Sequence, residues 1–274
     1  MQQILEVLRR IARGRKHVRY AWEFLTVWQI FRRPIMMIAG YLGFPITYPF
    51  LCVTKTGSTF SLLNQMDLIT AWVIYVRHEY YVCPTDNIIL DCGANIGIFS
   101  VFAANVAKSA KIYAIEPFPE TFRRLLYTVT LNNLAERVVC LNVALARENG
   151  NVYMETSTTL PCQSRHVVDC PDETAIMVKA VSLSSLLKTI NCSSADLLKM
   201  DIEGTEHTVL NSTRICDIAR FRRIAIEYHH TGIKTKLFNR FQAAGFSLRH
   251  DRVLGDNYGV ADFVRGLRGV GGGH

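Results

Sequence analysis

Two groups of acidic residues stand where the sequence could support chemistry, and the first surrounds a glycine-rich loop. Asp91 precedes the loop, Gly93, Asn95 and Gly97 form it, and Glu116 closes the next apolar run. A carboxylate about 20 residues after such a loop is the usual partner of a ribose diol, because two hydroxyls can donate to one ionised acceptor. The pattern therefore predicts a nucleoside-binding site.

The spacing of this loop differs from that of dinucleotide-binding proteins. Their fingerprint, G-x-G-x-x-G, receives a pyrophosphate at a helix N-terminus. Here the pattern is D-x-G-x-N-x-G, and Asp91 would repel a pyrophosphate but suit the ammonium group of an amino-acid tail. The loop resembles the first motif of doubly wound methyltransferases that use S-adenosylmethionine. The alternatives are a structural strand–helix turn and, among enzymes, a nicotinamide-dependent dehydrogenase, which the spacing and Asp91 disfavour.

The second acidic group follows an apolar run that ends at Met200. Asp201, Glu203 and Glu206 lie within six residues of one another, although the helix dipole alone would explain Glu206. Glu227 and His229 stand at the end of another apolar run. Neighbouring strands end at the same edge of a parallel sheet, so these side chains are expected to meet.

The elements that must position these residues alternate between strands and helices. This alternation predicts a doubly wound, mostly parallel sheet. Asn142 stands at the end of one strand, where its amide could bond an adenine edge or form an ordinary turn. The predicted strands are 87–90, 111–115, 138–141, 197–200 and 221–228, the main helices are 67–79, 96–104, 117–134 and 182–190, and extra strands are predicted at 152–155 and 177–181.

The sequence from Asp196 to Glu206, D-L-L-K-M-D-I-E-G-T-E, resembles the signature of the FkbM-type methyltransferases. D-C-G-A-N-I-G, I-E-P and I-E-Y-H segments elsewhere extend the resemblance over roughly residues 46–250, with Met200 where such families often have Ile. It implies a class I, Rossmann-like methyltransferase that uses S-adenosylmethionine on a hydroxyl of a sugar, polyketide or other small metabolite. The implied cofactor positions are Asp91, Gly93, Gly97 and Glu116, and the implied catalytic edge is Asp201, Glu203 and His229.

A hydroxyl nucleophile must lose its proton as it attacks the methyl carbon. His229 is our first choice for the base, because an imidazole titrates near neutrality, and Asp201 is the second. Asp201 could instead orient His229, or hold a divalent cation such as Mg²⁺ together with Glu227. An exposed pair of loop histidines, His229 and His230, is the alternative to a catalytic role.

The basic character of the chain lies in its N-terminal extension. Residues 1–43 carry a net charge of +6, whereas the other 231 residues carry about +2. Apolar residues recur at helical spacing from residue 3 to 31, so a basic amphipathic helix in residues 3–33 could contact an anionic membrane. The alternative is a helix that packs on its own domain or on a partner subunit. A non-catalytic membrane-surface adaptor is therefore a further candidate function.

Residues 34–54 contain no charged residue and are long enough to cross a bilayer. Two glycines and two prolines interrupt them, so we predict instead a helix that ends near Tyr41 and a hairpin formed by residues 50–54 and 59–63. The predicted domains are an extension, 1–45, a methyltransferase domain, 46–265, and a flexible tail, 266–274.

The remaining composition indicates a cytoplasmic protein. Eight cysteines include no C-x-x-C pair, although Cys162 and Cys170 could bridge a loop, and no secretory signal with a cleavage site precedes them. The polar segment 156–174 is a candidate substrate lid, since an insertion there falls on the ligand side of such a sheet. No nucleic-acid module is recognised, and the oligomeric state is left open.

Overall fold

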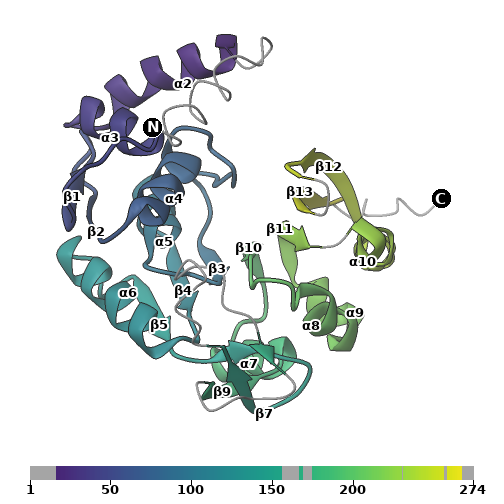
Figure 1. Cartoon of the computed structure of the whole chain (residues 1–274). Helices are drawn as coiled ribbons and strands as arrows, with labels where there is room; N and C mark the ends of the chain where they lie inside the picture. Colours follow the sequence, from purple (N-terminus) through teal and green to yellow (C-terminus); the bar gives the residue numbers. More distant parts are fainter. Residues whose placement is uncertain (1–16, 156–166, 169–174, 230, 256–257, 267–274) are drawn as a thin grey trace.

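The computed structural model describes residues 17–155, 167–168, 175–229, 231–255 and 258–266. Its centre is a seven-stranded sheet (Figure 1). The spatial order is β12 (Phe246–Val253), β13 (Tyr258–Arg265), β11 (Phe221–His229), β10 (Ala195–Met200), β3 (Ile88–Cys92), β4 (Lys111–Ile115) and β5 (Val138–Leu141). The strands from β11 to β5 are parallel, and β13 runs antiparallel to both of its neighbours.

Helices cover both faces of this sheet, because successive strand residues point to opposite sides. Ile89 and Leu197 face one core, while Leu90 and Leu198 face the other. The doubly wound, mostly parallel sheet predicted from the sequence is confirmed. The first core is covered by α4 (Gln65–Tyr75), α5 (Ile98–Val106) and α6 (Pro119–Leu131), and the second by α7 (Leu183–Thr189), α8 (Glu206–Ser212), α9 (Ile215–Ile218) and α10 (Thr231–Ala243).

The segment before the sheet folds as its glycines and prolines predict. Helix α3 (Pro34–Tyr41) ends at Tyr41, and β1 (Phe50–Val53) pairs antiparallel with β2 (Thr59–Leu62) in a hairpin. Across the described part of the chain, no helix combines the length and the apolar character that a membrane span requires.

A second, four-stranded sheet follows β5. It consists of β6 (Ala144–Leu145), β9 (Ile176–Val181), β7 (Gly150–Met154) and β8 (Val167–Val168), in that order. The two extra strands predicted in this region are β7 and β9. The predicted lid, apart from β8, lies outside the described residues, as do Cys162, Cys170 and the tail from residue 267. The other six cysteines are free thiols.

Helix α2 (His17–Ile30) lies at the outer edge of the molecule, beside α3 and outside α4 (Figure 1). Its Glu23 is buried and accepts hydrogen bonds from Trp72 Nε1 at 2.8 Å and from Arg77 Nε at 3.1 Å. Trp72 also stacks on Tyr41 of α3, with 4.0 Å between ring centroids. This side of α2 packs on its own domain, as one of the two sequence interpretations has it. The division near residue 45 stays a prediction.

Replacing Glu23 tests this anchor. We expect Glu23→Ala to lower the free energy of unfolding by about 2–3 kcal/mol, because a buried indole N–H and a half-buried guanidinium lose their acceptor. Denaturation by urea, monitored by circular dichroism, measures the loss. Gln29→Ala, at an exposed position of the same helix, is the control and should stay within about 0.5 kcal/mol of wild type. Equal free energies of unfolding for the two variants would show that Glu23 does not hold α2 to the domain.

Candidate active site

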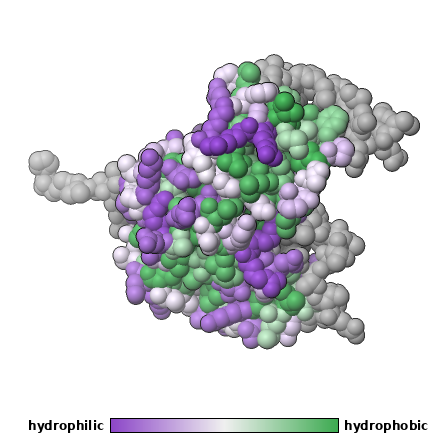
Figure 2. Space-filling model, turned by 90° about the vertical axis from the view of Figure 1, so that its left-hand side faces the viewer, coloured by the Kyte–Doolittle hydropathy of each residue, from purple (hydrophilic) through white to green (hydrophobic). Residues whose placement is uncertain are grey.

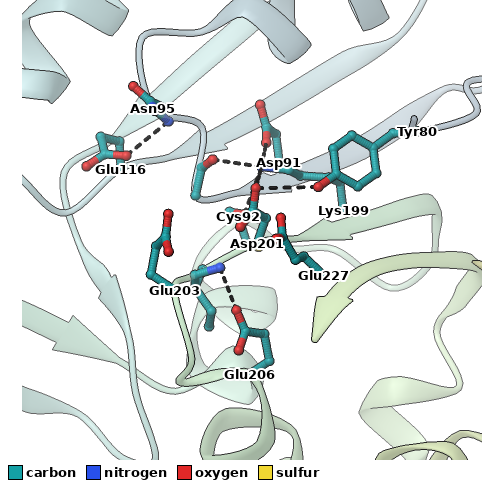
Figure 3. A network of polar contacts seen from close by, with 12 residues as sticks. Tyr80, Asp91, Cys92, Asn95, Glu116, Lys199, Asp201, Glu203, Glu206 and Glu227 are labelled. Carbon is teal, nitrogen blue, oxygen red and sulfur yellow. Dashed lines mark hydrogen bonds and ion pairs between the residues drawn. The ribbon is translucent and has the colours of Figure 1, made fainter. Parts of the chain in front are cut away.

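A cavity of about 1020 Å³ opens at the carboxyl ends of the parallel strands. The loop after β3 and the residues after β4 line one side of it, while the residues after β10 and the end of β11 line the other. Helix α4 and the β12–β13 connection complete its walls. The glycine loop and the acidic residues therefore face the same space, as Figure 3 shows. Its size is at the upper end of the usual range for small-ligand sites, about 300–1,000 Å³.

Gly93 joins the two sides of this cavity. Its φ is +77°, and a Cβ atom there would lie 1.7 Å from the carbonyl oxygen of Asp201. The backbones of the two loops thus touch where a side chain would stand. Gly97, at φ +87°, has a different neighbour, since its Cβ would lie 2.7 Å from Leu125 of α6. The close approach that Gly97 permits in this structure is that of helix α6.

Asp91 is fully buried, and its partners belong to the chain itself. Its Oδ1 lies 3.2 Å from Lys199 Nζ, and its Oδ2 accepts a hydrogen bond from Ser100 Oγ at 2.6 Å. Among the described residues, those that line the cavity do not include Asp91. Asp91 thus meets the ammonium group of Lys199, and its contact with the amino-acid tail of a donor stays a prediction.

Lys199 is itself buried and lines the cavity. It donates to the Gly93 carbonyl at 2.7 Å and lies 3.8 Å from Asp201. Burial alone would lower the pKa of Lys199, but Asp91 and Asp201 outweigh it and raise that pKa. The lysine thus stays charged and ties both loops together.

Glu116 lines the cavity opposite these residues. Each of its carboxylate oxygens accepts one backbone N–H, from Phe118 at 2.9 Å and from Asn95 at 3.0 Å. Burial raises the pKa of Glu116 to about 7, and these hydrogen bonds offset that effect in part. Of the two alternatives for Asn142, an adenine contact and an ordinary strand-end turn, the structure shows the turn. Its amide donates to the carbonyls of Glu116 and Pro117, each at 2.9 Å.

Three carboxylates, Asp201, Glu203 and Glu227, form an acidic rim on the other side of the cavity. Tyr80 donates a long hydrogen bond to Asp201, 3.4 Å, whereas the ring of its neighbour Tyr81 lies under Arg223 and Arg249. Burial and then Asp201 raise the pKa of Glu203 to about 7. The same two causes raise the pKa of Glu227 further, so Glu227 holds a proton at neutral pH.

His229 lies among three carboxylates. Its Nδ1 is 3.5 Å from Glu206, an ion-pair distance too long for a strong hydrogen bond, and its Nε2 is 3.8 Å from both Glu203 and Glu227. The interaction with Glu206 raises the pKa of His229, although burial opposes it. Glu206 also accepts backbone N–H groups from Ile202 and Gly204, so its structural explanation holds. His230 lies outside the described residues.

In the described part of the chain, no group of three or more His, Cys, Asp or Glu side chains is arranged to hold a metal ion. We therefore derive no step through a divalent cation at the acidic rim.

Comparison with known proteins identifies the family to which the chain belongs. Residues 91–248, more than half of the chain, match the methyltransferase FkbM domain. The chain belongs to the FkbM methyltransferase family. It is a methyltransferase, and its sheet is the Rossmann-like sheet of class I methyltransferases. The resemblance seen in the sequence is thereby confirmed.

Curated relatives agree with this assignment. The chain is 26% identical to methyltransferase sdnD of Sordaria araneosa, over 66% of this chain and 82% of the relative. It is 27% identical to the hexuronic acid methyltransferase AglP of Haloferax volcanii, over 73% and 77%. It is also 27% identical to the 31-O-demethyl-FK506 methyltransferase FkbM of Streptomyces tacrolimicus, over 57% and 70%.

Two residues of the site, Lys199 and Glu227, have interactions that the sequence did not indicate. Lys199 was part of the family signature but had no assigned role, although a lysine between Leu198 and Met200 in a buried strand is a signal of a buried ion pair. Glu227 was considered as a metal ligand alone. Its raised pKa depends on burial and on Asp201, which the pairing of β10 with β11 brings close to it.

Gly93→Ala tests the contact between the two loops. Gly57→Ala is a matched control, since Gly57 also has positive φ, +100°, but has nothing within 4 Å of the point that a Cβ atom would occupy. We expect Gly57→Ala to lower the free energy of unfolding by about 1–2 kcal/mol, the cost of the backbone conformation. Gly93→Ala should lose about 1–3 kcal/mol more, because the alanine methyl would displace the Asp201 backbone. Equal losses in urea denaturation would show that the loops do not touch.

Proposed function

We propose that the chain transfers the methyl group of S-adenosylmethionine to a hydroxyl of a small-molecule or glycan acceptor. One observation carries the proposal. The glycine loop with Glu116 and the acidic rim with Asp201 line a single cavity, so a donor held by the first would present its methyl group to the second. The family assignment favours methyl transfer over the nicotinamide-dependent dehydrogenase.

Glu116 fits the ribose of the donor. Its two oxygens each accept one backbone N–H, which leaves acceptor capacity on a carboxylate for two hydroxyl donors. Hydrogen bonds from those hydroxyls would also stabilise the charged form of a group whose pKa burial has raised. The glycine loop and Glu116 therefore supply a site for the nucleoside. Asn142 does not take part in this proposal.

The acidic rim fits the reacting end of the donor. When bound, S-adenosylmethionine supplies a methyl carbon that its sulfonium charge activates toward displacement. Carboxylates that face a cavity favour a positively charged ligand over a neutral one. Asp201 and Glu203 would thus favour the sulfonium over the uncharged thioether that remains after transfer. The protein must further align the acceptor and exclude water.

Glu203 is the best-matched group for the acceptor proton. A base works best when its pKa lies near the operating pH, and burial brings Glu203 to about 7. His229, the base preferred from the sequence, has a raised pKa and retains its proton to higher pH. We therefore assign His229 to hold Glu203 and Glu206 in place, and Asp201 to orient the acceptor hydroxyl.

The relatives support the acceptor class. AglP is named for hexuronic acid, and FkbM of Streptomyces tacrolimicus is named for the 31-O position of FK506. Both names denote hydroxylated compounds. A small hydroxylated acceptor also suits the volume of the cavity, which exceeds what a nucleoside alone requires.

Calorimetry with S-adenosylhomocysteine tests the donor site. We expect Glu116→Gln to weaken binding by roughly 10–100-fold, because two charge-assisted hydrogen bonds to the ribose are lost. Glu120→Gln, at an exposed position on α6, is the control and should bind like wild type. The 2′-deoxy analogue separates ribose contact from misfolding, since wild type should discriminate against it and Glu116→Gln should not. Failure of the wild-type protein to bind S-adenosylhomocysteine would overturn the proposal.

The pH dependence of methyl transfer tests the base. Transfer of tritiated methyl to glucuronic acid and to hydroxylated polyketides first identifies a usable acceptor. With it, kcat/KM should rise with pH through about 7, since Glu203 must be ionised to accept a proton. Glu203→Gln should abolish this rise and lower kcat/KM by about 10²–10⁴-fold. If Glu203→Gln keeps the rise and His229→Gln removes it, the imidazole is the base instead.

A further inference from the structure

Helix α2 is held to the domain by one side and exposes large apolar residues on another. Glu23 and Val27 are buried, whereas Trp22, Leu25 and Trp28 are 72%, 59% and 50% exposed. At 3.6 residues per turn these three side chains share one face of the helix. Packing on the domain does not use this face, so its apolar character needs another explanation.

Further exposed apolar side chains come from the segment that follows α2. Seven of the fifteen large hydrophobic side chains that are exposed in the described residues come from the segment 22–63. The other members of this set are Ile35, Phe44, Leu51 and Leu63. Figure 2 looks onto this side of the molecule, and hydrophobic residues reach its surface among hydrophilic ones. Single exposed apolar residues are ordinary, but a concentration of this kind marks an interaction surface.

The charges on residues 22–66 indicate the charge of the surface that this segment binds. Glu23 is the single acidic residue between Trp22 and Met66, and it is buried against Trp72 and Arg77. The exposed charges of this segment are Arg32, Arg33 and Lys55, all positive. Residues 1–16 add Arg9, Arg10, Arg13, Arg15 and Lys16 against Glu6. A surface with these cations and no exposed carboxylate in residues 22–66 is complementary to an anionic one.

We propose that the α2 face, formed by Trp22, Leu25, Trp28, Arg32 and Arg33, binds the surface of an anionic lipid bilayer. Indole rings favour the boundary between headgroups and acyl chains, because they join an apolar body to a polar N–H. Arg32 and Arg33, which follow the helix in sequence and are exposed, gain from the negative potential of acidic headgroups. The helix lies along the membrane plane while Glu23 keeps it attached to the domain. This inference is independent of the proposed reaction.

The tryptophans provide a direct readout. The chain has three, and Trp72 is fully buried, so vesicles can change the emission of Trp22 and Trp28 alone. We expect the emission of the full-length protein to shift to the blue with vesicles of phosphatidylcholine and phosphatidylserine. Phosphatidylcholine vesicles should produce a much smaller shift. No shift with either vesicle would overturn the proposal.

Co-sedimentation with the same vesicles tests both parts of the face. Trp22→Ala with Trp28→Ala should reduce the partition coefficient at least about tenfold, and Arg32→Gln with Arg33→Gln roughly 30-fold. Tyr153→Ala with Met177→Ala is the control, since these cross-strand neighbours are exposed on the four-stranded sheet. It should bind like wild type.

Sedimentation velocity without vesicles distinguishes a second copy of the chain as the occupant. If the protein is a dimer that Trp22→Ala with Trp28→Ala converts to a monomer, and vesicles do not pellet it, the face is a subunit interface and the lipid proposal fails. Equal pelleting of wild type and both α2-face variants would overturn it as well.

Discussion

The active site depends on one buried cation, Lys199. Its ammonium group contacts Asp91, the Gly93 carbonyl and, at longer range, Asp201. Asp91 lies near the end of β3 and Asp201 follows β10, and the parallel register places Lys199 directly opposite Asp91. A buried carboxylate without a partner would be strongly destabilising, and Lys199 supplies that partner to Asp91. The same contact fixes the glycine loop, because the lysine donates to its first carbonyl.

The close approach of Gly93 and Asp201 makes this arrangement rigid. A side chain at residue 93 would meet the backbone of the opposite loop, so the two halves of the site share one wall. Their separation is therefore set by main-chain contact and by Lys199, and not by flexible side chains at the rim. A donor held by one loop is consequently at a defined distance from the groups on the other. Alignment of this kind is the main contribution that a protein can make to an in-line displacement.

The arrangement of acidic groups at the rim is electrostatically unfavourable in the folded chain. Glu203 and Glu227 are largely buried beside Asp201, and their raised pKa values mean that the folded chain binds protons more tightly than the unfolded chain does. Stability from these groups is present at low pH and is lost as pH rises above about 4.5, the ordinary pKa of a glutamate. The loss extends to about 7 for Glu203 and to about 10 for Glu227. A cationic ligand at the rim would offset this repulsion. Functional sites commonly retain such unfavourable charge where binding can relieve it.

The sequence predicted the residues whose positions follow from strand ends, and it failed where partners come from distant segments. The ends of β3, β4, β10 and β11 carry Gly93, Glu116, Asp201 and His229, and all four line the cavity. The partner of Asp91 depends on the register between β10 and β3, which no local pattern specifies. Strand β12 was not predicted, because most of its side chains are exposed and polar and lack the alternation of a half-buried strand. The raised pKa of His229 likewise depends on Glu206, which approaches it from another element.

Arg77 links the N-terminal helix directly to the active-site cavity. Arg77 follows α4, lines the cavity and binds Glu23 of α2, while α4 itself contributes Met66, Ile69 and Val73 to the cavity wall. A helix that is fixed by a buried charge pair cannot tilt away from the domain without exposing Arg77 and Trp72. The basic extension and the cavity wall are thus parts of one packed unit, although the family match begins only at residue 91. Any force on the exposed face of α2 is therefore transmitted to α4, which forms part of the cavity wall.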